Sequence, residues 1–117
     1  MNEEEKAIRE FRLYELLRRA SLNDSILLRE NDWEQVEAEF RSLWPDFGQK
    51  LYLCGAHLSD IEMRICWMAR MDIPPKGMDT ILKRTKPAIS LARSRLYEKL
   101  THTPGTGKMF DEFIRRL

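Results

Sequence analysis

The stretch that decides the fold is residues 58–100, LSDIEMRICWMARMDIPPKGMDTILKRTKPAISLARSRLYEKL. It opens on Ser59 with Glu62 three residues later, a capping box that predicts a helix from about residue 58 to Met71. The apolar residues of this helix fall on two faces, with Ile61, Ile65, Met68 and Ala69 on one and Met63, Trp67 and Met71 on the other. A helix that is apolar on two faces is normally packed between neighbours, so we expect residues 1–57 to cover Met63 and Trp67.

Prolines mark the two turns that follow. The pair at 74–75 forces a turn and is tolerated at the start of a short helix over residues 75–83. Thr85 is a candidate N-cap, and Pro87 falls in the first turn of a longer helix that reaches Leu100. This order of elements is that of a helix-turn-helix, which consists of a capped helix, a turn, a short helix, a second turn and a longer basic helix.

The rest of the chain shows helical patterns and no strand pattern. Further helices are expected over residues 3–29, from about Trp33 to Pro45, over 47–54 with a stop at Gly55, and over 108–117. For the second of these, Asn31 and Asp32 break the preceding helix and offer the N-cap. We therefore predict an all-α fold with an N-terminal amphipathic helix (1–31), supporting helices (32–57), and a helix-turn-helix domain with a closing C-terminal helix (58–117).

Length and composition exclude several classes of protein. With 117 residues and 43% apolar content, the chain is long enough for one domain with a real core. It contains no run of about eighteen apolar residues, so neither a membrane span nor a membrane partner is expected. The first residues lack the basic and apolar regions of a signal peptide, and two cysteines make no disulfide framework. A cytoplasmic location is therefore expected.

No arrangement of residues predicts an enzyme, a cofactor or a metal site. The GTGK string at 105–108 lacks the glycine spacing of a phosphate-binding loop, and no Ser or Thr follows it. Cys54, His57, Cys66 and His102 do not follow the spacing of zinc ligands. Cys66 is better interpreted as a small core residue.

The charges are divided along the chain. Residues 1–57 carry 8 Lys or Arg against 12 Asp or Glu, whereas residues 58–100 carry 9 against 5. Within residues 76–99 the ratio is 7 basic to 2 acidic. Such a local basic excess favours a phosphate backbone as partner, although basic helices are also common on ordinary solvated surfaces.

The longer basic helix divides into an apolar face and a polar face. Ile89, Ala92, Leu96 and Leu100 recur at helical spacing and predict the face turned to the core. On the other face, the predicted DNA base contacts are Ser90, Leu91 and Ser94, because hydroxyls bond several base edges and Leu can meet a thymine methyl. The predicted DNA phosphate contacts are Lys83, Lys86, Arg93, Arg95 and Lys99.

The segments LSDIEMRIC (58–66), IP (73–74) and KPAISLARSRLYEKL (86–100) resemble the LuxR-type (GerE-like) helix-turn-helix. More narrowly, they are similar to the C-terminal output domain of bacterial tetratricopeptide-repeat transcriptional regulators. The similarity extends upstream through 32–34, Phe47 and Leu51, and so covers about residues 32–117. It implies a LuxR-like helix-turn-helix bundle and transcriptional regulation through double-stranded DNA, with Ser90, Leu91 and Ser94 at positions that face bases.

Asp79 departs from this resemblance. Such domains usually place a small alanine at this position of the short helix, close to the neighbouring helix. A carboxylate there needs a partner or a rotation of the helix, because burying it unpaired is costly.

Two functions remain open. The first is sequence-specific transcriptional regulation through the helix-turn-helix, and the second is a degenerate helix-turn-helix that binds a partner protein without binding DNA. The N-terminal helix offers an apolar surface for a homodimer, formed by Ile8, Phe11, Leu13, Tyr14 and Leu17. The alternative is that this helix folds back and fills the core of its own chain.

Overall fold

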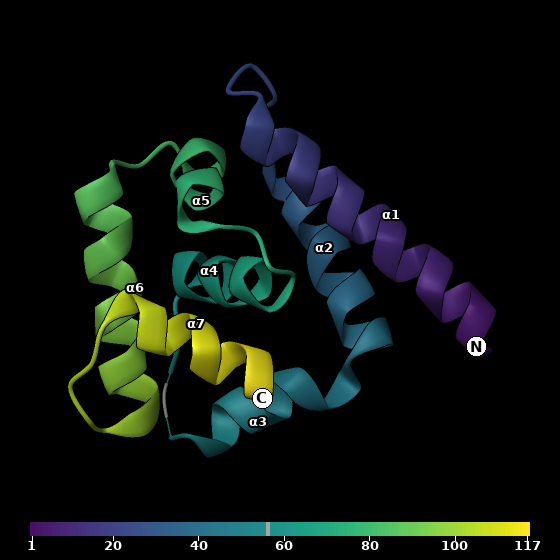
Figure 1. Ribbon diagram of the computed structural model, residues 1–117. Helices are drawn as coiled ribbons and strands as arrows, with labels where there is room; N and C mark the ends of the chain where they lie inside the picture. The colour runs from purple at the N-terminus through teal and green to yellow at the C-terminus, as the bar shows by residue number, and fades with distance from the viewer. Residues whose placement is uncertain (56) are drawn as a thin grey trace.

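The computed structural model describes residues 1–55 and 57–117, which form seven helices and contain no strand. The helices are α1 (Glu3–Leu22), α2 (Glu30–Leu43), α3 (Pro45–Leu53), α4 (Asp60–Arg70), α5 (Pro75–Leu82), α6 (Lys86–Thr101) and α7 (Gly107–Arg116). In Figure 1, α4 lies at the centre of the molecule, with α6 to one side and α2 to the other. The predicted all-α class is confirmed.

Local capping explains where the helices of residues 58–100 begin. The Glu62 amide donates to Ser59 Oγ at 3.2 Å, and the Ser59 amide donates to Glu62 Oε1 at 2.9 Å, so the capping box is formed. Thr85 caps α6 by accepting from the Ala88 amide at 3.3 Å. The α5 helix ends at Leu82, and its C-cap residue Lys83 has a left-handed φ of 55°. These boundaries agree with the predicted ones.

Two predicted boundaries in the N-terminal half are wrong. The first helix ends at Leu22, because Asn23 Oδ1 accepts hydrogen bonds from the amide and hydroxyl of Ser25 and turns the chain there. The second helix begins at Glu30, three residues before Trp33. Asp32 does not act as its N-cap; it lies inside the first turn and accepts a hydrogen bond from the Arg29 amide at 2.8 Å.

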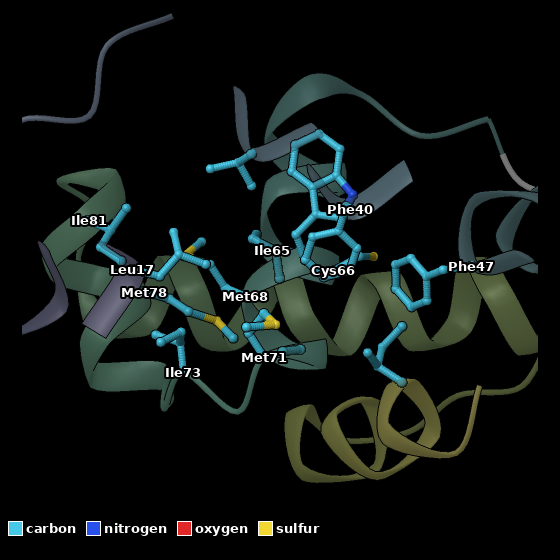
Figure 2. Close-up of a cluster of buried hydrophobic side chains, with 14 of the residues drawn as sticks. Leu17, Phe40, Phe47, Ile65, Cys66, Met68, Met71, Ile73, Met78 and Ile81 are labelled. Carbon is cyan, nitrogen blue, oxygen red and sulfur yellow. The ribbon is translucent and has the colours of Figure 1, made fainter. Parts of the chain in front are cut away.

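The core is built around α4, whose five consecutive residues from Ile65 to Ala69 are all buried. Trp67 is 8% exposed and stacks on Trp33 of α2, with 6.5 Å between ring centroids. Burial of Trp67 against the N-terminal half is thus confirmed, whereas Met63 is only half-buried. Figure 2 shows the cluster running from Leu17, Met78 and Ile81 at one end, through Ile65, Cys66 and Met68, to Phe40 and Phe47 at the other.

Helix α1 folds back on its own chain. Leu13, Leu17 and Ala20 are buried, and α1 packs mainly on α5. The two helices approach so closely that a Cβ on Gly77 would lie 2.7 Å from Ser21 Cβ. Arg9 also joins α1 to α2 through a hydrogen bond of 2.6 Å to Glu39 Oε1. The buried face of α1 therefore matches the fold-back alternative.

Candidate nucleic-acid interface

Helix α6 is held by its predicted apolar face. Ile89, Leu96 and Leu100 are buried, and α6 packs on α7, α5 and α4. Ser90 and Arg95 each lie one position from this stripe and are exposed, because successive residues of a helix are rotated by about 100°. The short helix α5 and the turn at residues 83–85 bring the N-terminal end of α6 beside α5 (Figure 1).

The three predicted base-contact residues share the outer face of α6. Ser90 is exposed, Leu91 is 49% exposed, and Ser94 is half-buried. Ser94 Oγ donates to the Leu91 carbonyl at 3.0 Å, which uses its one proton within the helix. The lone pairs of that oxygen can still accept a hydrogen bond from outside. The face thus offers a hydroxyl, a second hydroxyl acceptor and an apolar side chain within a little more than one turn.

Three of the predicted phosphate contacts are exposed on or beside this face, namely Lys83, Lys86 and Arg95. Lys83 lies in the turn before α6, where its Nζ donates to the Asp24 carbonyl after α1. Arg84 is also exposed in this turn, between Lys83 and Lys86. The sequence analysis did not name Arg84 as a phosphate contact. Its position between two basic residues was the signal that could have predicted this role.

The structure removes Arg93 from the predicted phosphate contacts. Its side chain is buried, and its guanidinium pairs with the Asp111 carboxylate of α7, with Nε donating to Oδ1 at 3.1 Å and Nη2 to Oδ2. The guanidinium lies against Gly107, where an added Cβ would be 2.8 Å from Arg93 Cζ. Arg93 follows Ile89 by four residues and precedes Leu96 by three, so it falls on the buried stripe.

Lys99 is also committed within the protein. Its Nζ donates to Glu62 Oε1 at 2.9 Å, the same carboxylate oxygen that accepts the Ser59 amide. Burial alone would raise the pKa of Glu62, but the Ser59 amide and the Lys99 ammonium together lower it below its ordinary value. Lys99 therefore links α6 to the first turn of α4 rather than standing apart on the outer face.

Asp79 of α5 carries an unsatisfied atom. Its Oδ1 is buried, and none of the described residues donates a hydrogen bond to it. Its backbone carbonyl, by contrast, accepts from both the Lys83 and Arg84 amides at the end of α5. The sequence analysis predicted that a buried carboxylate at this position would need a partner. None of the described residues provides a hydrogen-bond donor for Asp79 Oδ1.

Among residues 1–55 and 57–117, no group of three or more His, Cys, Asp and Glu side chains could hold a metal ion. Burial raises the pKa of the Cys66 thiol, which keeps it protonated and unreactive. None of the described helices is long and apolar enough to cross a membrane.

Comparisons of the chain with protein-family models, curated proteins and solved structures found no match. The likeness to LuxR-type domains therefore rests on the sequence of residues 58–66, 73–74 and 86–100 alone.

Proposed function

We propose that this protein is a sequence-specific DNA-binding transcriptional regulator that inserts α6 into the major groove of double-stranded DNA. The observation that carries the proposal is the outer face of α6. Ser90, Leu91 and Ser94 lie there, outside the core, beside the exposed basic residues Lys83, Arg84, Lys86 and Arg95. A B-DNA major groove, about 12 Å wide, admits an α-helix whose outer side chains reach base edges.

The basic residues would position the helix on the backbone. Lys83, Arg84 and Lys86 lie around the first turn of α6, where the unpaired amides and the helix dipole also favour an anion. Arg95 extends the positive charge along the same helix. Because such contacts neutralise phosphates without distinguishing bases, they should control affinity and its salt dependence.

Sequence would be read by the small polar and apolar side chains. Ser90 Oγ can donate to or accept from a base edge, Ser94 Oγ can accept, and Leu91 can contact a thymine methyl. The ion pair between Arg93 and Asp111 supports this arrangement, because it fixes α6 on α7 before any DNA arrives.

The test is a selection from random duplexes, followed by fluorescence anisotropy on the selected site and a scrambled one. We expect S90A/S94A to lose about 1–3 kcal/mol of discrimination per affected base pair. Arg95→Ala should weaken binding to both duplexes alike. It should also lower the slope of log affinity against log salt concentration by about one. Arg41→Ala is the matched control, since Arg41 is an exposed arginine on α2. Enrichment of no sequence, or unchanged preference in S90A/S94A, would contradict the proposed base-reading roles.

A degenerate helix-turn-helix that binds protein is the second candidate, and the buried, unpartnered Oδ1 of Asp79 favours it. A buried carboxylate oxygen without a hydrogen-bond donor costs free energy in α5, the helix that packs beside α6. Binding to a partner protein through this face need not show steep salt dependence, whereas DNA binding must. A titration at about 50 and 200 mM salt separates the two, because several phosphate contacts change DNA affinity by orders of magnitude over that range.

We also propose that the protein dimerises through the outer face of α1. Phe11 is 63% exposed and Ile8 is 45% exposed, although their helix is already packed on α5 and α2. Two copies would place two recognition helices on neighbouring half-sites, which raises both affinity and specificity.

A further inference from the structure

Two adjoining hollows form one groove between α2 and α4, and residues from the start of α3 line one of the two. One has a volume of about 320 Å³ and the other about 270 Å³, and both are lined by Glu37, Met63 and Trp67. On α4, Trp67 turns toward Trp33 of α2, whereas Glu62 bonds Lys99 of α6. The groove and α6 therefore lie against different sides of α4, and the groove takes no part in the proposed DNA interface.

The floor of the groove is apolar. Trp67 is nearly covered, and Met63 is half-buried beside it. The aromatic faces at either end are already occupied, because Arg64 Cζ lies 5.0 Å from the Trp33 ring centroid and Arg70 Cζ lies 5.1 Å from that of Trp44. An aromatic cage for a methylated ammonium needs open ring faces. The floor instead suits an aliphatic side chain that contacts Met63 and the edge of Trp67.

The rim of the groove is acidic. Four carboxylates line it, Glu30, Glu34, Glu37 and Asp60. Two are neutralised within the protein: Glu30 pairs with Arg64 at 2.8 Å and Glu37 with Arg41 at 2.7 Å. Glu34 and Asp60 are exposed and form no ion pair with another described residue. The groove thus presents a carboxylate without an ion-pair partner on each of α2 and α4.

We propose that this groove is a docking site for a basic, amphipathic peptide segment of a partner protein, in which Lys or Arg residues flank an aliphatic side chain. The aliphatic side chain fills the space over Met63 and Trp67, and the basic residues meet Glu34 of α2 and Asp60 of α4. Charge complementarity selects this occupant, since an acidic or purely apolar segment gains nothing from the rim. Because the site lies apart from α6, the partner and DNA can be bound together.

The test uses three capped peptides with the intact protein: Lys-Lys-Leu-Leu-Lys-Lys, Lys-Lys-Ser-Ser-Lys-Lys and Glu-Glu-Leu-Leu-Glu-Glu. The Met63 methyl and the three tryptophan indole N–H groups are followed by NMR during each titration. We expect saturable shifts at Met63 and Trp67 with the first peptide alone. E34Q/D60N should weaken that binding roughly five- to tenfold, since exposed charge pairs each contribute modestly.

The matched control is E3Q/E4Q, which removes two exposed carboxylates from α1, and it should leave the affinity unchanged. Equal shifts with the serine peptide would show a merely electrostatic attraction, and shifts confined to α1 or α6 would place the peptide elsewhere. Either result overturns the proposal. So does a change of the Met63 and Trp67 signals when the protein alone is diluted, because a second copy of the chain would then occupy the groove.

Discussion

Arg93 of α6 and Asp111 of α7 form a largely buried ion pair, and Gly107 lies against the Arg93 guanidinium. The absence of a side chain at Gly107 lets the start of α7 rest directly on the guanidinium. The pair joins the helix that is proposed to read DNA to the closing helix of the chain. Its removal should therefore affect both stability and DNA binding.

Asp111→Ala should lower the free energy of unfolding by about 3–5 kcal/mol, because it leaves a buried arginine without its counter-charge. R93M/D111L should recover much of this loss, since it removes both buried charges together. Urea denaturation at neutral pH measures both effects. Glu98→Ala is the control, an exposed carboxylate on α6, the helix that carries Arg93, and should change stability by less than about 0.5 kcal/mol. A loss for D111A no larger than for E98A would contradict a structural role for the pair.

Gly77→Ala should destabilise the fold by about 1–3 kcal/mol, the usual cost of overpacking. The added Cβ would lie 2.7 Å from Ser21 Cβ and 2.9 Å from Ile73 Cγ2, so α1 and α5 would have to separate. Gly48→Ala in α3 is the matched substitution, because nothing lies within 4 Å of its Cβ. That change should stabilise by about 0.5–1 kcal/mol through helix propensity. Thermal unfolding of the two variants should give shifts of opposite sign.

Asp79→Ala should raise the free energy of unfolding by about 1–3 kcal/mol, because it removes a buried oxygen that lacks a hydrogen-bond donor. Alanine also suits the interior of α5 better than aspartate does. Asp79→Asn should gain less, because its amide keeps an oxygen at the same position. Chemical denaturation of the parent protein, D79A and D79N gives the order of their free energies of unfolding. A destabilised D79A would show that the carboxylate has a partner in solution.

Stability should fall in acid partly through Glu62. Its pKa is lowered in the folded protein, so its contribution is fully present above the ordinary glutamate pKa and is lost as the pH falls through the lower folded value. Glu62→Gln should therefore be less stable than the parent at neutral pH and should lose less on acidification. Unfolding curves between about pH 7 and pH 3 test this. If the stability of the parent protein and of E62Q fell in parallel with pH, Glu62 would not contribute to the loss of stability in acid.

Phe11→Asp should convert a dimer into a monomer without unfolding the chain, because Phe11 is exposed and faces away from the packed side of α1. Sedimentation equilibrium at micromolar concentration measures the mass, and circular dichroism monitors the fold. Leu17→Asp is the contrasting variant, since Leu17 is fully buried and its replacement should unfold the protein. A parent protein that sediments as a monomer, both free and on a single operator site, would refute dimerisation through α1.

The sequence alone determined the helices of residues 58–100 and the all-α class. Ser59 meets Glu62 and Thr85 meets Ala88, so each cap joins residues three apart and forms whatever the rest of the chain does. The two apolar faces of α4 likewise predicted a helix packed on both sides, with Trp67 covered. Such features depend on spacing within one turn or one helix, which a sequence displays directly.

Only the tertiary structure decided which charged side chains are available to a partner. Arg93 finds Asp111 across 18 positions, and Lys99 finds Glu62 across 37, so neither pairing can be read from local spacing. The groove between α2 and α4 arises in the same way, because it exists only where Trp33 and Trp67 bring two distant segments together. Electrostatic pairing and burial depend on distance in space, and in this chain that distance is set by how α4 packs between its neighbours.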